Sequence, residues 1–464
     1  MIKDRMGNLV VAAFVALVAL GAASCQPCTV AESGDKHSVS LHTPEAENVL
    51  ANLRRLPKEG RCIVSWTHPW DEDGTDFAVR DANGTWRPKP IESSTLDGYV
   101  KRRTGKDPLL YFTDFYICLG TWEGQGVYAR RMANMEGFIL KAYDEFHAIP
   151  VFSWHIENPY APHRRLLPRQ AKSEAYRYRH SCDGYPQEHR YVFKEILDGT
   201  GSTCGMGRKD EKYESDTSSF PTPRAWYDAQ LDKVCAFLAR LKDRHGRPIP
   251  AIVRLFHECD GSWFWWGPDS TSCEDYISLF RYSVSEIRRR TGLASLLFLY
   301  SPDRWWNTKE QFMCRYPGDD VVDIIGFDDY SIGRPPSGWT GSKVDGILKT
   351  LEGTIARMRV VSEIARERGK PAGLTETGIS GDEWLTGFKP SPSDASGFYG
   401  LCLRLMRTEG TSFSFFNTWG GDYTIPKTEE GLRCWREALD RPEALTAGKG
   451  YDLVAPGGAA AFVQ

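Results

Sequence analysis

The stretch Arg254-Leu-Phe-His-Glu-Cys-Asp-Gly-Ser-Trp-Phe-Trp-Trp-Gly267 is the most informative segment of this chain. It continues a short apolar run from Ala251, so it begins as the end of a predicted strand. His257 and Glu258 lie at that strand end, and three tryptophans then follow within four residues. One interpretation is a core strand that runs into an aromatic-rich loop. Because a histidine, two acids and three indoles are unusual in a packing element, we favour a ligand site.

The residue types of this segment match the chemistry of carbohydrates. A protonated carboxyl such as that of Glu258 can donate to a glycosidic oxygen, and flat indole rings stack on the apolar faces of pyranose units. Aromatic residues make up 12% of the chain, with 15 Trp and 20 Tyr, which points the same way. We therefore expect a site that binds and cleaves a sugar chain.

The overall composition is that of a globular protein without a basic region. Charged residues make up 26% of the 464 residues, and apolar residues make up 41%. The formal net charge is −3 and no basic stripe occurs, so nucleic acid is not expected as a partner. The length allows two domains, but it also fits one large α/β barrel with insertions.

The N-terminus has the pattern of an export signal. Residues 1–25 combine Lys3 and Arg5 with an apolar run and a small-residue cleavage region. Small residues directly before Cys25 resemble a bacterial lipobox, so we expect a lipid anchor at Cys25, followed by a tether over 26–40. The expected location is the bacterial outer membrane or cell surface. Plain secretion or a periplasmic location, with Cys25 unmodified, is the alternative.

The twelve cysteines do not indicate a disulfide framework, because a chain of this size does not need one for its core. No pair of Cys-x-x-Cys motifs occurs at the spacing of a zinc site, so no structural metal is expected. Cys182 and Cys204 lie in a polar region and are the best candidates for a bridge. Four cysteines in apolar segments are predicted to be buried thiols, namely Cys62, Cys118, Cys235 and Cys402.

Apolar runs alternate with amphipathic stretches from about residue 60, as in βα units around a parallel sheet. Eight strands are predicted, at residues 62–67, 109–115, 148–154, 251–256, 295–300, 321–327, 372–375 and 412–416. Helices are predicted at 225–245, 273–291, 343–369 and 394–409. This order predicts a (β/α)₈ TIM barrel over residues 41–450, with a long insertion at 160–222 after the third strand.

Polar residues recur where these apolar runs end. They are Asp114, His155, Glu258, Ser301, Asp328, Glu376 and Asn417. Any one of them alone is explained as a turn or cap residue, but this barrel carries its chemistry at the carboxyl ends of its strands. Glu258 closes the fourth strand and Glu376 the seventh, so the two glutamates are expected to face each other across the barrel mouth.

Four motifs together resemble glycoside hydrolase family 26. His257-Glu258 followed by Gly261-Ser-Trp-Phe-Trp-Trp-Gly267 resembles the acid/base signature of that family. The other three are Thr375-Glu376 for the nucleophile strand, Asp323-Ile-Ile-Gly-Phe-Asp-Asp-Tyr330 for the sixth strand, and Ser153-Trp154-His155 with Asn158-Pro159 for the third. The resemblance spans roughly residues 40–445. Cys259-Asp260 departs from the residues usual in the family.

The resemblance implies a role for each matching residue. Glu258 would be the general acid/base, and Glu376 the nucleophile that forms a covalent glycosyl-enzyme. Tyr330 and Arg254 would hold Glu376 in its rotamer, although Arg254 and Asp328 could also simply pair inside the barrel mouth. The remaining predicted substrate contacts are His155 and Trp419 around the reacting sugar, Trp263 as a platform on the leaving-group side, and His257, which would orient Glu258 or touch the substrate.

The implied activity is retaining hydrolysis of internal β-1,4-mannosidic bonds in mannan, glucomannan or galactomannan. The polysaccharide is the expected partner, and this chemistry requires no cofactor and no metal. Other activities of the family stay open: mannobiohydrolase, β-1,3-xylanase and mixed-linkage glucanase. Two further alternatives are an inverting hydrolase, with carboxyl groups about 6.5–9.5 Å apart, and a surface glycan-binding protein that has lost catalysis.

Overall fold

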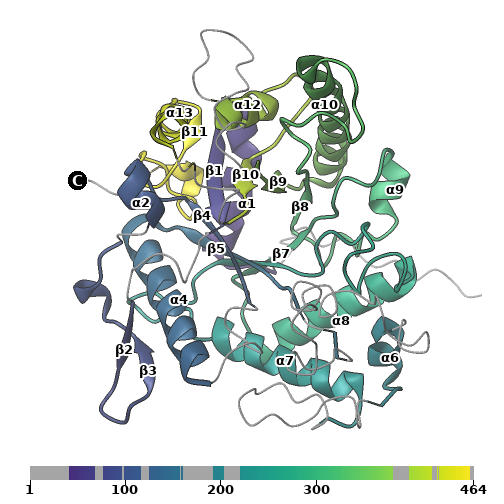
Figure 1. The fold of residues 1–464 in the computed structure, drawn as a ribbon. Coiled ribbons are helices and arrows are strands. Elements are labelled where there is room, and N and C mark those ends of the chain that lie inside the picture. The colour runs from purple at the N-terminus through teal and green to yellow at the C-terminus, as the bar shows by residue number, and fades with distance from the viewer. Residues whose placement is uncertain are drawn as a thin grey trace, which may run out of the picture. The chain divides into compact units, whose positions relative to one another are not determined.

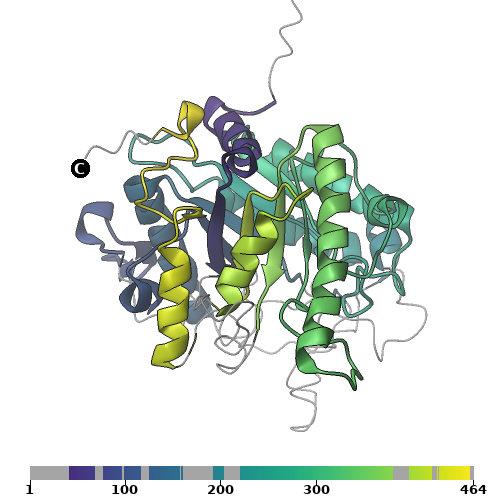
Figure 2. The same ribbon diagram turned by 90° about the horizontal axis from the view of Figure 1, so that it is seen from above.

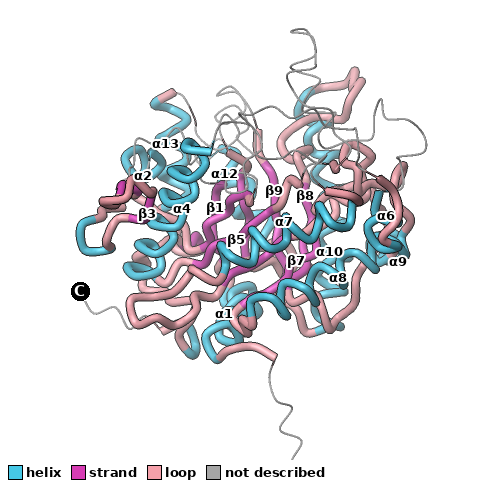
Figure 3. Tube along the Cα trace, turned by 90° about the horizontal axis from the view of Figure 1, so that it is seen from below, coloured by secondary structure: helices cyan, strands magenta, loops and turns pink. Residues whose placement is uncertain are grey.

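The apolar runs of the chain form a closed parallel sheet in the computed structural model of the protein (Figure 1). Eight strands pair in chain order from β1 through β4 to β10, and β10 pairs back with β1. A short strand, β11, adds to β1 in the parallel sense. Helices surround these strands (Figure 3), so the predicted (β/α)₈ barrel is confirmed.

The structure describes residues 41–67, 77–96, 99–115, 125–156, 158–159, 192–202, 220–379, 397–420, 426 and 428–459. The residues from His42 onward group into one compact unit by their contacts. The predicted signal peptide at 1–25 and tether at 26–40 lie outside the described residues, as do Cys25, Cys118, Cys182 and Cys204.

All eight predicted strands overlap observed ones, because each apolar run is buried inside the barrel wall. The strands are β1 (Cys62–Thr67), β4 (Leu110–Asp114), β5 (Ile149–Ser153), β6 (Ala251–Arg254), β7 (Leu296–Tyr300), β8 (Ile324–Asp328), β9 (Ala372–Thr377), β10 (Phe415–Thr418) and β11 (Ala444–Leu445). The eighth barrel strand begins three residues later than predicted, at Phe415. Before it, the Ser412 N–H donates to Ser362 Oγ at 2.8 Å instead of to a neighbouring strand.

The helices cover the outside of the barrel, and Figure 2 shows α10, α12 and α13 running alongside the strands. The helices are α1 (Pro44–Arg55), α2 (Tyr99–Thr104), α4 (Gln125–Phe146), α6 (Val192–Asp198), α7 (Pro223–Leu238), α8 (Cys273–Thr291), α9 (Lys309–Met313), α10 (Lys343–Arg368), α12 (Gly397–Met406) and α13 (Glu429–Leu439). Single 3₁₀ turns are η1 (Leu56–Glu59), η2 (Ile91–Ser93) and η8 (Pro456–Gly458). Within the described residues, no helix combines the length and apolar composition needed to cross a membrane.

Two helices show why some boundaries were predictable and others were not. Helix α8 has the predicted bounds, because the Ser272 side chain caps its start and Gly292 takes a left-handed conformation after its end. The prediction of a helix over 225–245 was wrong at its C-terminal end, since α7 stops at Leu238. Beyond it the Asp243 carboxylate accepts the N–H groups of His245 and Arg247, at 2.9 and 2.8 Å, and closes a tight turn instead.

The predicted insertion at 160–222 contains a helix in its described part. Helix α6 packs against α7 and α8, and Phe193 on α6 lies 4.9 Å from the ring of Phe256 and 5.1 Å from that of Trp265. The insertion therefore supports the segment that follows β6 from the outside. A separate antiparallel ribbon, β2 (Ala78–Arg80) with β3 (Trp86–Pro88), follows β1 in the chain.

One disulfide forms within the described residues, between Cys273 at the start of α8 and Cys314 after α9. Sequence reasoning did not find this pair, because 41 residues separate the two cysteines and nothing local links them. Cys62, Cys235 and Cys402 are buried free thiols, as predicted. Arg315, which directly follows Cys314, donates to the carbonyl oxygens of Trp266 and Thr271. The disulfide therefore helps to anchor the aromatic segment after β6.

Removal of the disulfide in a C273A/C314A variant should lower the free energy of unfolding by about 2–4 kcal/mol, because a 41-residue loop is released in the unfolded chain. Guanidinium denaturation of the oxidised wild type and the variant measures this difference. As a control, a reductant should destabilise the wild type and leave the variant unaffected. Equal midpoints for oxidised wild type and variant would contradict the prediction.

Candidate active site

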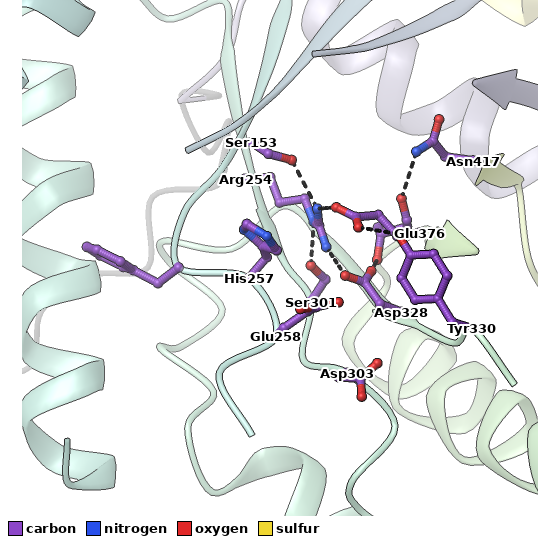
Figure 4. A network of polar contacts seen from close by, with 12 residues as sticks. Ser153, Arg254, His257, Glu258, Ser301, Asp303, Asp328, Tyr330, Glu376 and Asn417 are labelled. Atoms are coloured by element: carbon purple, nitrogen blue, oxygen red, sulfur yellow. Dashed lines mark hydrogen bonds and ion pairs between the residues drawn. The ribbon is translucent and has the colours of Figure 1, made fainter. Parts of the chain in front are cut away.

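The carboxyl ends of β6, β8 and β9 bring three charged side chains together in the barrel mouth. Arg254 ends β6, Asp328 ends β8, and Glu376 lies near the end of β9. All three are almost completely buried. Figure 4 shows the Arg254 guanidinium between the two carboxylates. Polar side chains on different strands therefore converge on one point, as the strand-end pattern predicts.

Arg254 makes four side-chain hydrogen bonds and is fully buried. Its Nη1 donates to Glu376 and its Nη2 donates to Asp328. Its Nε donates to Ser301 Oγ at 2.6 Å, and Nη1 also donates to Ser153 Oγ at 3.0 Å. The predicted contact of Arg254 with Glu376 and the alternative pairing with Asp328 both occur, because a planar guanidinium presents donors in several fixed directions.

Glu376 is held by a second donor and by a local irregularity of the sheet. Tyr330 Oη donates to its Oε2 at 2.8 Å, as the resemblance implied. Between β8 and β9 the register shifts, so that Asp328 lies opposite Glu376 and Thr375 is the extra residue. The Thr375 hydroxyl donates to Asp328, and Asn417 Nδ2 donates to the Thr375 carbonyl at 3.2 Å. The bulge thus sets the two acids side by side.

The backbone that carries Glu258 is strained. Phe256 and Glu258 both have positive φ angles, 45° and 53°, which cost of order 1–3 kcal/mol each for residues with a Cβ. Two hydrogen bonds hold this conformation: Tyr276 Oη donates to the Phe256 carbonyl at 3.0 Å, and the Glu258 N–H donates to the Ser301 carbonyl at 2.9 Å. With this backbone conformation the Glu258 side chain lies near Asp328 and Glu376, with one carboxyl oxygen of each within 4.8 Å of the others.

The three tryptophans after β6 have different environments. Trp265 and Trp266 are fully buried and donate to the carbonyls of Ile156 and His257, at 3.0 and 2.7 Å. Trp263 is 39% exposed, and its Nε1 donates to Glu258 Oε2 at 2.6 Å. Two of the indoles are therefore structural, while Trp263 both positions the Glu258 carboxyl and offers an open ring.

The predicted histidines form one chain of contacts. The Nδ1 of His155 bonds to the Asp114 carboxylate, and its Nε2 lies 3.2 Å from Nε2 of His257. The ring of Trp419 lies 5.6 Å from the His155 ring. The Nε2 atoms of His155 and His257 lie at hydrogen-bond distance, so one of these two histidines donates to the other. The donor observed on Glu258 is Trp263, and the predicted role of His257 in orienting Glu258 stays a prediction.

Burial, and then the charges of Asp328 and Glu376, raise the pKa of Glu258 well above its ordinary value of 4.5. The protonated form of Glu258 is consequently favoured. One carboxyl oxygen each of Glu258, Asp328 and Glu376 lies within 4.8 Å of the others. A carboxyl with a raised pKa beside a carboxyl that accepts two hydrogen bonds is the arrangement that acid–nucleophile pairs require.

A group of three carboxyls at this spacing can bind a divalent cation. In this protein Arg254 supplies positive charge at that position. Burial alone would lower the pKa of Arg254, but the charges of Asp328 and Glu376 raise it above its ordinary value. The negative charge of the cluster is therefore partly offset by a side chain of the barrel itself.

The structure adds polar groups that were not predicted as site residues. Ser153 and Thr375 contact the charged cluster; both belong to motifs quoted for the family resemblance, but neither was assigned a role of its own. Burial, and then the charge of Asp260, raise the pKa of Asp303 to about 8. Asp303 follows β7 after Ser301-Pro302, so the only sequence signal was its position after a strand.

A cavity of about 340 Å³ lies at the opposite end of the barrel. It is bordered by the starts of β9 and β10 and by the basic side chains of Arg54, Lys58, Arg366 and Lys370. Because it lies at the amino ends of these strands, it is separate from the acid cluster and contributes nothing to the chemistry there.

Comparison with known proteins places this site in a family. A sequence model of glycosyl hydrolase family 26 matches residues 211–355. A mannan endo-1,4-beta-mannosidase of Bacillus subtilis is 37% identical over 329 residues, which cover 70% of this chain and 73% of that protein. The chain belongs to glycosyl hydrolase family 26.

Other similar proteins match over different extents. A mannan endo-1,4-beta-mannosidase of Bifidobacterium adolescentis is 32% identical over 233 residues, which are 48% of this chain and 22% of that protein. This family 26 chain thus spans less than a quarter of that longer relative. The solved structure of GH26C from a Muricauda species has 24% sequence identity and a TM-score of 0.65, covers 89% of this chain and 94% of that chain, and confirms the fold.

The raised pKa of Glu258 predicts a pH-dependent effect of E258Q on stability. Between the unfolded pKa of 4.5 and the higher folded pKa, only the folded state keeps the proton, so wild-type stability falls as pH rises through this window. Glutamine removes this loss and still accepts from Trp263. The melting temperature of E258Q should therefore exceed that of wild type at about pH 8 and match it near pH 4. The exposed Glu352, changed to Gln, is the control, and a pH-independent difference for E258Q would argue against this linkage.

Proposed function

We propose that this family 26 chain hydrolyses internal β-1,4-mannosidic bonds of mannan, glucomannan or galactomannan with retention of anomeric configuration. The observation that carries the proposal is the pairing of Glu258 and Glu376, whose nearest oxygens lie within 4.8 Å. Retaining enzymes hold their carboxyl groups about 5–5.5 Å apart, and inverting enzymes about 6.5–9.5 Å. The substrate rests on the relatives from Bacillus subtilis and Bifidobacterium adolescentis, both mannan endo-1,4-beta-mannosidases.

In the first step Glu376 attacks the anomeric carbon, while Glu258 donates its proton to the leaving oxygen. In the second step Glu258 takes a proton from water, which displaces Glu376 and releases the sugar. Tyr330 and Arg254 fix the attacking carboxylate, and the Trp263 N–H fixes the acid. Because Glu258 must be protonated at the start, activity should fall as pH rises through its raised pKa.

The other predicted residues take binding roles in this proposal. His155 and Trp419 border the reacting sugar, and His257 acts on it through its hydrogen bond to His155. The exposed ring of Trp263 supports the sugar on the leaving-group side, directly beside the acid. Asp328 helps to place Glu376 in two ways. It forms an ion pair with Arg254, which also binds Glu376, and it lies opposite Glu376 at the bulge.

Replacement of the two glutamates tests the mechanism. E376A should lower kcat on mannohexaose by roughly 10⁴-fold or more and retain binding of the sugar. With an aryl β-mannobioside and azide, E376A should form the α-mannosyl azide, because azide replaces Glu376 on the same face. E258A should form the β-azide, because azide then attacks the glycosyl-enzyme. The surface variant E352A is the control for general damage.

The same assay separates the alternatives. An active E376A variant would refute the assignment, and a wild type that binds mannan without cleaving it would favour the glycan-binding alternative. An inverted first product would favour the inverting alternative. Product analysis on mannan, glucomannan, xylan and mixed-linkage β-glucan then distinguishes the endo-mannanase from the mannobiohydrolase, xylanase and glucanase activities.

We also propose that the chain is exported and anchored by a lipid at Cys25. Support comes from the charged, apolar and small-residue pattern of residues 1–25, and from the Cys273–Cys314 disulfide, since disulfides persist in oxidising compartments. Labelled palmitate supplied to a bacterial host should enter the wild-type chain but not C25A, and C25A should move to the soluble fraction. An unlabelled wild type would favour plain secretion.

A further inference from the structure

Trp305, in the loop after β7, is a strongly exposed aromatic side chain. It is 62% exposed, whereas the adjacent Trp306 is 1% exposed and donates its indole N–H to the Asp303 carbonyl at 2.7 Å. Both tryptophans follow the fifth predicted strand, so the sequence does not distinguish a packing role from a platform role for either of them. The structure separates them, because Trp306 anchors the loop and Trp305 projects into solvent.

Trp305 lies beside the indole that contacts the acid. The ring centres of Trp305 and Trp263 are 6.5 Å apart and the rings are inclined by 61°. Trp263 in turn donates to Glu258 at 2.6 Å. Two neighbouring aromatic rings therefore lead from the Glu258 carboxyl to the exposed ring of Trp305. A chain of sugars leaving the Glu258 side would meet Trp263 first and Trp305 second.

The loop that carries Trp305 is fixed to the turn that carries Glu258. The two carboxylate oxygens of Asp260 accept the backbone N–H groups of Asp303 at 2.5 Å and of Trp305 at 2.8 Å. Arg304, between them, places its guanidinium 5.3 Å from the Trp305 ring centre. An exposed indole on a loop tied down in this way retains its position before a ligand arrives, which reduces the entropy lost on binding.

We propose that Trp305 forms a second sugar platform on the leaving-group side, beyond Trp263, and that Asp260 is the residue that positions it. The ligand is a β-linked pyranose unit, which stacks its apolar C–H face on the indole. This inference rests on the proposed function, because it assumes that the chain between Glu258 and Glu376 is cut and that the leaving part runs past Trp263. The second platform makes the enzyme favour substrates with at least two sugar units on that side.

Substrates of different length test this platform. In mannopentaose the leaving part contains enough sugar units to reach Trp305, whereas in an aryl β-mannobioside the leaving group is one aryl ring. For W305A, the ratio of kcat/KM on mannopentaose to kcat/KM on the aryl substrate should fall about fivefold to tenfold. W305F should recover most of the ratio, since phenylalanine restores a stacking face.

Asp260 is tested by the same ratio. In D260N the amide can accept only one of the two N–H groups and turns an NH₂ donor toward the other, so the loop loosens. The ratio should fall in D260N, and the double variant W305A/D260N should be no worse than W305A, because both changes remove one platform. L348A, which removes an exposed apolar side chain from α10, should leave the ratio at its wild-type value.

Each outcome decides for or against the platform. An unchanged ratio in W305A, or an equal loss on both substrates, overturns it. If the wild type hydrolyses neither substrate, the proposed function fails separately, and calorimetric titration of wild type and W305A with manno-, gluco- and xylohexaose tests the platform alone. Weaker binding of one of these sugars by W305A then supports the platform, and equal binding of all three refutes it.

Discussion

The buried guanidinium of Arg254 is the interaction on which the rest of the site depends. It lies between the carboxylates of Asp328 and Glu376, and it donates two further hydrogen bonds to the hydroxyls of Ser153 and Ser301. Removal of one partner from such a buried group typically costs about 3–5 kcal/mol, because a charge is left uncompensated. The four partners come from four different strand ends, so the pairing requires the closed barrel and its register.

The same cluster gives the two glutamates different environments. Glu376 accepts hydrogen bonds from Arg254 and Tyr330, two donors that suit a carboxylate. In contrast, burial and the neighbouring negative charges raise the pKa of Glu258. Two hydrogen bonds maintain the strained backbone at Glu258: Tyr276 Oη donates to the Phe256 carbonyl, and the Glu258 N–H donates to the Ser301 carbonyl. The burial and the neighbouring negative charges favour the protonated form of Glu258, and the strained backbone positions its carboxyl group.

The aromatic residues divide into a rigid support and an open surface. Trp265 and Trp266 are buried, bonded to backbone carbonyls, and backed by Phe193 from the insertion. Trp263 and Trp305 are the exposed pair. The buried indoles, the disulfide and Arg315 fix the segment after β6, and the exposed rings are thereby held at defined positions.

The sequence by itself determined the eight strands, the barrel and the two glutamates, since buried parallel strands appear as short apolar runs and their polar ends mark the catalytic face. It also determined α8, whose caps at Ser272 and Gly292 are local. Only the tertiary structure decided the bulge that pairs Asp328 with Glu376, the partner of Cys273, and which tryptophans are exposed. Those features depend on contacts between residues far apart in the chain, and an indole on a loop has the same local sequence signal whether it packs or projects.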